Sequence, residues 1–413
     1  MHASRALLVA VFLLAPLLPG VGAASVPGSR PPSSADSLRL FAVENLRQLS
    51  SSERDAVFTE SVVAARDALD NRDFATALRI ADRVCLLWKR SRRPLLQRAA
   101  AQLGLNQYAD AIVSAREASE ARADRLPPEA RPNENEGAAE YWEGVALYRT
   151  QRYEEALPAL RAATEKSPQW AEAARALAEV CFVTARHEEA VRAYARALEL
   201  DPQVGNARDA SYYAEALVAR GDLEGGIAAM QRALARDAYL PGLHANMGRL
   251  LRQDGNLTEA YYHFTLELLL HGVRGPYAPK ALEQAGEVLD LVRKDNSHPS
   301  RHELLLVSSG LGYLDGDRAS RAVPELQHAA SITRSATGLP QLLLGEALLK
   351  SGHLEPARRV LESVLQLEPE FVPALTLLAE TLRALGDREQ AQLTVDRAHA
   401  LFPTFWKLQP NAQ

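Results

Sequence analysis

Residues 137–202 read GAAEYWEGVALYRTQRYEEALPALRAATEKSP and then QWAEAARALAEVCFVTARHEEAVRAYARALELDP. The two lines superimpose when their terminal prolines are aligned, which places Gly144 on Ala178 and Pro168 on Pro202. A fixed period of about 34 residues is typical of a solenoid, in which helical hairpins stack side by side. The stretch therefore predicts a repeat array rather than a globular enzyme core.

Small and large side chains occupy fixed positions in each period. Gly144 and Ala156 allow two antiparallel helices to approach closely, while Leu147 and Leu160 fill the space beside them. Pro168 ends the second helix because proline has no N–H to donate to the helical ladder. This pattern resembles the tetratricopeptide repeat family, in which the same positions recur with this period. The resemblance implies an all-α, right-handed superhelical solenoid.

The pattern recurs in weaker form along the chain and predicts about nine hairpins in two sub-arrays. We expect an N-terminal array at 38–271, which contains a polar loop at 122–137. An irregular insertion with one helix follows at 272–302, and a C-terminal array with a capping tail occupies 303–413. Within the insertion, residues 280–293 carry apolar side chains at helical spacing. This spacing fits either a single unpaired helix (an orphan helix) or a degenerate hairpin (a worn hairpin).

Local signals predict how the first array begins. Residues 38–49 have the composition of a short helix. The sequence SSSE at Ser50 to Glu53 is a capping box, in which a serine and a glutamate satisfy each other's backbone N–H groups. A longer helix is therefore expected to start immediately after Ser50.

The N-terminal residues have the features of a secretory signal. Residues 1–24 contain a basic Arg5, an apolar run at 6–18 and then small residues that suit cleavage. The run is shorter than the roughly 20 residues that a spanning helix needs, so we favour cleavage and keep an uncleaved anchor as the alternative. Residues 25–37 form a linker rich in Pro, Ser and Gly. We expect an exported protein, periplasmic or secreted, with no membrane span after cleavage.

Composition narrows the class of partner. The formal net charge is −5, from 47 basic and 52 acidic residues, which argues against a nucleic-acid-binding protein. The two cysteines, Cys85 and Cys181, fall at packed positions of different repeats, so they are expected as small buried side chains rather than as a disulfide. The sequence has no phosphate-binding loop, metalloprotease motif or nucleophile elbow. We expect no enzymatic activity, no cofactor and no metal site.

The resemblance also implies which side chains face the partner. In tetratricopeptide repeats the first helix of each hairpin lines a concave groove. Carried onto this chain, the groove positions give hypothetical partner-binding residues on four successive hairpins: Tyr141, Trp142, Tyr148, Arg175, Glu179, Phe182, Arg208, Tyr212, Glu215, Asn246, Arg249 and Arg252. Aromatic residues and arginine are common at binding hot spots. Packing between helices remains the alternative for Trp142 and Phe182, and a solvated ion pair for Arg175 with Glu179.

These observations favour a non-enzymatic scaffold that binds a protein or peptide segment in its groove. In similar proteins such arrays support envelope assembly, polysaccharide export or secretion complexes. The alternative is a carbohydrate-binding or polysaccharide-export accessory module, since grooves lined by aromatic residues also suit sugars. The groove lacks the lysines of the carboxylate clamp that chaperone co-factors carry. The C-terminal array is more apolar, with Leu342 and Leu343 at groove positions, and is expected to support self-association.

Overall fold

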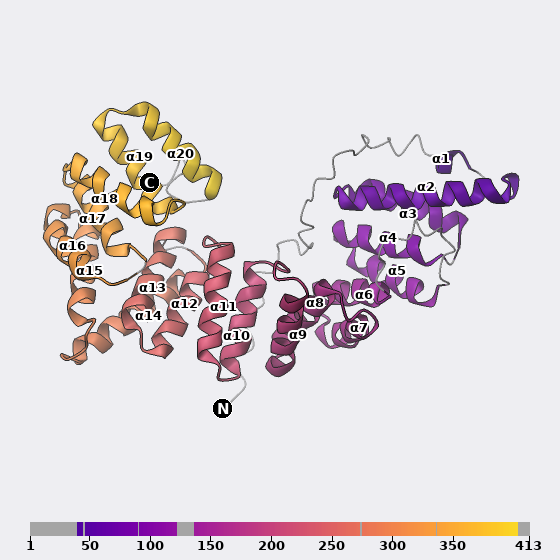
Figure 1. The fold of residues 1–413 in the computed structure, drawn as a ribbon, viewed down its shortest axis with the longest axis horizontal. Helices are drawn as coiled ribbons and strands as arrows, with labels where there is room; N and C mark the ends of the chain where they lie inside the picture. Colours follow the sequence, from indigo (N-terminus) through magenta and orange to yellow (C-terminus); the bar gives the residue numbers. More distant parts are fainter. Residues whose placement is uncertain are drawn as a thin grey trace. The chain divides into compact units, whose positions relative to one another are not determined.

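A computed structural model describes residues 39–43, 46–89, 91–121, 136–272, 275–335 and 337–403 (Figure 1). These residues fold into helices joined by short turns, and no strand occurs among them. The all-α class predicted from the repeat is therefore confirmed. The predicted signal peptide, the linker, most of the 122–137 loop and the tail from 404 onward lie outside the described residues.

Successive helices of the described chain pair into antiparallel hairpins. A short helix α1 (Arg39–Ala42) and a 3-10 turn (Leu46–Gln48) precede them. The hairpins, nine in the described residues, are α2 (Ser51–Asp70) with α3 (Phe74–Leu87), α4 (Arg92–Gly104) with α5 (Tyr108–Glu120), α6 (Ala138–Arg149) with α7 (Tyr153–Lys166), α8 (Ala171–Val183) with α9 (His187–Leu200), α10 (Ala207–Ala219) with α11 (Leu223–Arg236), α12 (Leu243–Asp254) with α13 (Leu257–His271), α15 (Arg301–Asp315) with α16 (Ala319–Ile332), α17 (Leu339–Lys350) with α18 (Leu354–Leu367), and α19 (Val372–Leu385) with α20 (Arg388–Leu401).

One helix stands outside this pairing. Helix α14 (Ala278–Lys294) packs against α13 and is followed by the α15–α16 hairpin, so the insertion holds a single orphan helix rather than a worn hairpin. Its buried side chains include Ala281, Ala285 and Val288, as the spacing predicted. Leu282 is one of the apolar residues of this segment, but its side chain is 60% exposed and does not belong to the buried face.

The chain divides into two compact units, residues 1–205 and 206–413, which we call unit 1 and unit 2. Unit 1 holds the hairpins up to α8–α9, and unit 2 holds α10 to α20. Sequence analysis placed the division between sub-arrays later, at 272–302, where the structure has the orphan helix α14. Each unit is described by itself below.

Close contact within each hairpin depends on a small residue facing a large one. A Cβ added to Gly144 would lie 2.5 Å from Leu160 Cγ, and one added to Gly345 would lie 2.6 Å from Leu361 Cδ2. Gly248 and Gly310 stand in the same relation to Phe264 and Leu326, and the offset along the sequence is the same in every pair. The glycines therefore set the distance between the paired helices, and the larger partners fill the space that the missing Cβ leaves.

The turn inside each hairpin has one residue with left-handed backbone geometry. Glycine occupies this position four times, at Gly221, Gly255, Gly352 and Gly386. The other five hairpins place a residue with a side chain there, with φ between 53° and 61°: Arg72, Asn106, Gln151, Ala185 and Asp317. For Arg72, Gln151 and Ala185 this conformation costs about 1–2 kcal/mol, whereas Asn106 and Asp317 adopt it more readily. The repeat therefore imposes the turn geometry even where the local sequence disfavours it.

The predicted capping box opens α2. The Ser50 backbone N–H donates to Glu53 Oε2 at 2.8 Å, and the Glu53 N–H donates to Ser50 Oγ at 3.2 Å. These two bonds satisfy two of the backbone donors that the start of a helix leaves free. The helix start predicted at Ser50 is confirmed.

Candidate functional site

All twelve predicted groove residues lie on the first helices of their hairpins. In unit 1 they come from α6 and α8, and in unit 2 from α10 and α12. The two units bury these side chains to different extents, so we take them in turn.

In unit 1 the polar groove residues form a buried network. The Tyr148 hydroxyl of α6 donates to Glu179 Oε1 of α8 at 2.8 Å. Arg175 lies one turn before Glu179 and pairs with its other oxygen at 3.4 Å. Arg175 also hydrogen-bonds the Tyr141 hydroxyl, and burial raises the pKa of that hydroxyl. Tyr141, Tyr148, Arg175 and Glu179 are each at most 5% exposed.

This burial corrects the expectation that these four side chains face an open groove. Long side chains on α6 and α8 reach across the space between the two first helices and satisfy one another there. Arg175 and Glu179 are accordingly a buried pair rather than a solvated one. Such pairs are costly to break, because the remaining charge is left buried without a partner. The network joins two consecutive hairpins and gives this face of unit 1 a fixed geometry.

The large aromatic residues of unit 1 are also used in packing. The Trp142 ring is half-buried against the apolar cluster of Leu95 and Ala138, and lies 4.9 Å from the Tyr141 ring. Phe182 is half-buried, and its ring centroid lies 6.0 Å from that of His187. The packing alternative therefore describes both residues, although each keeps part of its surface exposed.

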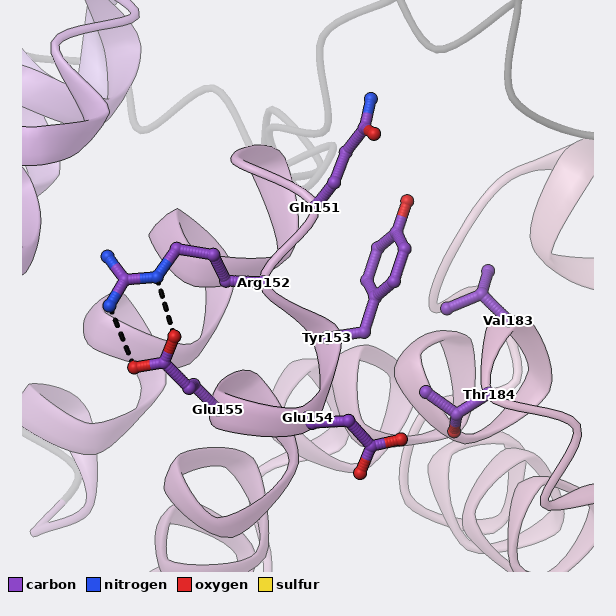
Figure 2. A pocket seen from close by; sticks show the side chains of 7 residues that line it. All are labelled: Gln151, Arg152, Tyr153, Glu154, Glu155, Val183 and Thr184. Carbon is purple, nitrogen blue, oxygen red and sulfur yellow. Dashed lines mark hydrogen bonds and ion pairs between the residues drawn. The ribbon is translucent and has the colours of Figure 1, made fainter.

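A shallow pocket of about 390 Å³ lies where α6 turns into α7. Figure 2 shows Tyr153 between this turn and the facing residues Val183 and Thr184. Arg152 and Glu155 at the rim form two hydrogen bonds with each other, at 2.8 and 2.7 Å. These two charges at the rim therefore neutralise each other.

In unit 2 the groove residues form a more open, positively charged face. Glu215 of α10 accepts a hydrogen bond from Asn246 Nδ2 of α12 at 2.9 Å. Burial raises the pKa of the Glu215 carboxyl, and the nearby charges of Arg249 and Lys280 act in the opposite direction. Lys280 belongs to α14, so three helices, α10, α12 and α14, contribute to this cluster.

Cations outnumber anions in this cluster. Arg208, Arg249 and Lys280 form no side-chain ion pair with any described residue, whereas Arg252 pairs with Glu287. Arg208 and Arg249 are half-buried and Lys280 is exposed. Two tyrosines flank the cations, Tyr212 on α10 and Tyr277 just before α14, and the charge of Arg208 acts on the Tyr277 hydroxyl. We call Arg208, Tyr212, Glu215, Asn246, Arg249, Tyr277 and Lys280 the cationic face.

Sequence reasoning missed Lys280 and Tyr277, because it treated 272–302 as an insertion outside the groove. A signal was available in the apolar spacing of α14. Once Ala281, Ala285 and Val288 are assigned to the buried side, Lys280 falls on another side of the same helix.

Two further statements hold for the residues that the structure describes. No helix there is long and apolar enough to cross a membrane. No group of three or more His, Cys, Asp or Glu side chains in these ranges could hold a metal ion. Cys85 and Cys181 are both free thiols.

Comparisons with known proteins give the following similarities. One family model described as tetratricopeptide repeat matches residues 96–169 and 141–204. A second model with the same description matches residues 348–409. Among the curated proteins, no sequence matches this chain.

Several solved structures resemble the chain at low identity. MamA 41-end from Desulfovibrio magneticus RS-1 is 20% identical, over 44% of this chain and 95% of that one, with a TM-score of 0.35. A structure described as MamA MSR-1 C2 is 17% identical, over 47% of this chain and 93% of that one, with a TM-score of 0.33. The Naa15/Naa10 complex bound to HypK-THB is 14% identical, over 85% of this chain and 64% of that one, with a TM-score of 0.30.

Proposed function

Because tetratricopeptide repeat models match residues 96–204 and 348–409, we propose that the chain is a non-enzymatic scaffold that holds a segment of another protein. The cationic face of unit 2 is the binding surface in this proposal, and the bound segment carries acidic side chains. Unit 1 contributes a rigid array of hairpins.

The observation that carries this proposal is a set of cations that have no ion pair among the described residues. Two of these cations, Arg249 of α12 and Lys280 of α14, act through their charges on the carboxylate of Glu215, and the third, Arg208 of α10, acts on the Tyr277 hydroxyl beside it. That carboxylate already accepts a hydrogen bond from Asn246. The excess positive charge favours a partner with carboxylates, and arginine binds carboxylates through two parallel hydrogen bonds.

The tyrosines of this face suit the same kind of partner. Tyr212 is half-buried and Tyr277 is 38% exposed, so both present apolar ring surface next to the cations. Aromatic rings and arginine together are typical of binding hot spots. The carbohydrate-binding alternative relied on exposed aromatic residues in the groove, and two of these, Tyr141 and Tyr148, are buried in unit 1. An acidic peptide segment is therefore the better supported ligand.

A peptide-display selection on the purified full-length chain tests this proposal. Selected peptides should be rich in Asp and Glu, and their affinity should fall as salt is raised, because exposed charges are screened. The variant Arg249→Glu should lose the binding. The matched control Arg232→Glu reverses a more exposed arginine on α11 and should keep it. Selection of neutral or basic peptides, or equal binding by both variants, would reject the acidic ligand.

The proposal places this scaffold outside the cytoplasm, on the basis of residues 1–24. An apolar run after a basic residue, followed by small residues, supports export and cleavage. Fractionation of cells that express the full chain, followed by N-terminal sequencing, tests this point. A mature N-terminus near Ala24 or Ser25 in the exported fraction supports export, and an intact chain in the cytoplasm contradicts it.

A further inference from the structure

In unit 2 the last hairpin returns to the segment that joins α11 to α12 (Figure 1). The Tyr239 hydroxyl donates to the Glu370 carbonyl and accepts from the Val372 N–H at 3.2 Å. Glu370 and Val372 form the corner where α19 begins, so one hydroxyl satisfies a carbonyl and a free helix N–H together. Residues more than 130 positions apart in the sequence therefore close this part of the unit.

Phe402, at the end of α20, completes the closure. Its ring stacks on Tyr239 with centroids 4.9 Å apart, and it also lies 5.9 Å from the His271 ring. The apolar residues beneath it, Val372, Leu375 and Ala398, are fully buried, at 0 to 1% exposure. We call the contacts of Tyr239, Phe402 and His271 the closure.

Behind the closure lies a buried group of histidines. His244 Nδ1 and His263 Nδ1 are 2.8 Å apart, so in the neutral pair one nitrogen donates and the other accepts. The His244 ring also donates to the carbonyl of Ala238, the residue next to Tyr239. A neutral His244 that donates to Ala238 accepts at Nδ1, so His263 donates in that tautomer. If both rings were protonated, all four ring nitrogens would carry hydrogens. The facing Nδ1–H groups of His244 and His263 would then repel each other.

His271 connects this group to a buried carboxylate. His271 Nε2 lies 3.9 Å from Glu267 Oε1. Glu267 accepts from the backbone N–H groups of Gly242 and Ala245, at 2.9 and 3.3 Å, and so caps α12 from the neighbouring helix. These two bonds leave further acceptor capacity on the Glu267 carboxylate, so an ionised Glu267 attracts a charged His271 and opposes its release.

We propose that this closure is a pH-sensitive latch: protonation of His271 and of the His244–His263 pair releases the α19–α20 hairpin from the α11–α12 segment. Two contacts connect protonation of the histidines to the closure. His271 touches Phe402 directly, and His244 holds Ala238, next to Tyr239. A charged imidazole at either position needs water that the closed arrangement excludes.

The direction of the effect follows from the burial of each group. Burial lowers the pKa of His244, His263 and His271, that of His263 to about 4. The closed form is therefore favoured above about pH 6.5, and this preference is lost as the pH falls from there towards 4. If opening hydrates His263 alone, the ratio of open to closed forms rises about 30-fold between pH 7.5 and pH 5.

The other titratable groups around the latch need separate consideration. Burial raises the pKa of Glu267 on α13 and of Glu368 before α19, so their protonation favours the closed form and opposes opening. Asp237, before α12, raises the pKa of His271. The Tyr239 and Tyr277 hydroxyls have pKa values raised by burial and stay neutral throughout this range, while Glu370 acts on Tyr239 through its charge.

Pulsed electron–electron spin resonance on the full chain tests the latch. Spin labels at Arg232→Cys on α11 and Gln392→Cys on α20, in a Cys85→Ser/Cys181→Ala background, report the distance across the closure. A control pair at Arg359→Cys on α18 and Gln392→Cys spans two adjacent hairpins and should not change. We expect one narrow distance at pH 7.5 across the closure, and a growing longer component as pH falls to 5.

Two variants separate titration from general unfolding. His244→Asn/His263→Asn/His271→Asn should show the same distances at pH 7.5 and pH 5, because asparagine takes up no proton at any of the three positions. Tyr239→Phe removes the hydroxyl that bridges Glu370 and Val372 and should show the longer component already at pH 7.5. A distance that stays short from pH 7.5 to pH 4.5 with the control pair unchanged would overturn the latch. A longer component that still grows as the pH falls in the triple histidine variant would overturn it as well.

Discussion

Replacement of Gly345 by alanine measures how tightly the hairpins are packed. The new Cβ would lie 2.6 Å from Leu361 Cδ2 and 2.7 Å from Leu361 Cγ, so the α17–α18 hairpin must widen or Leu361 must move. Overpacking of this kind costs about 1–3 kcal/mol. Alanine recovers about 1 kcal/mol, because glycine is the weaker helix former. We expect a net loss of about 1 kcal/mol in local stability.

Gly286 provides the matched control. It lies inside the exposed part of α14, and a Cβ added there meets nothing within 4 Å. Gly286→Ala should therefore show the gain in helix propensity alone, about 1 kcal/mol. The difference between the two variants, about 2 kcal/mol, isolates the contact with Leu361.

Hydrogen exchange of the full chain, followed by mass spectrometry of peptides from α17–α18 and from α14, gives the local opening free energies. Gly345→Ala should speed exchange in α17–α18, and a second change, Leu361→Val, should slow it again. That double variant reproduces the pair Ala379 and Val395, one period later. The reasoning would be refuted if Gly345→Ala slowed exchange in α17–α18 as much as Gly286→Ala slows it in α14.

Three further predictions concern the turns, the buried network and the histidines. Ala185→Gly removes a left-handed alanine with φ 57° and should stabilise unit 1 by about 1 kcal/mol in a denaturant titration, whereas a loss would contradict the turn geometry. Tyr148→Phe leaves one oxygen of the buried Glu179 without its 2.8 Å donor and should cost about 1–3 kcal/mol; an unchanged midpoint would show that water replaces the hydroxyl. Lowering the pH from 7.5 to 5 should cost unit 2 about 2 kcal/mol through His263, whose pKa burial lowers to about 4, because the unfolded chain binds the extra proton. His263→Asn should remove that part of the pH dependence in the same denaturant titrations.

Much of the fold follows from the period alone. The coincidence of Gly144 with Ala178 and of Pro168 with Pro202 predicts hairpins, and each glycine faces its large partner at a fixed spacing. The capping box at Ser50 is equally local, because both of its hydrogen bonds join residues three positions apart. Such features were predictable, since each depends on residues within one repeat.

Contacts between repeats were less predictable. Burial of Tyr148 against Glu179 depends on the approach of two first helices in consecutive repeats, which the period does not specify. The stacking of Tyr239 on Phe402 depends on the accumulated curvature of all the hairpins between them. Lys280 was missed because the insertion breaks the register, although α14 continues the row of helices beside α12. The candidate site therefore needed the structure, while the fold did not.

The most direct test of the proposed function is the affinity of one selected acidic peptide for three forms of the full chain, measured by isothermal titration calorimetry. Arg249→Glu reverses a charge beside Glu215 and should weaken binding at least about tenfold, an effect of about 1.4 kcal/mol. Arg232→Glu makes the same change in net charge on α11 and should leave the affinity within about twofold of the wild type. If both variants weakened binding equally, the net charge of the chain alone would account for the attraction to the peptide. Unchanged affinity in Arg249→Glu would contradict the assignment of the cationic face as the binding surface.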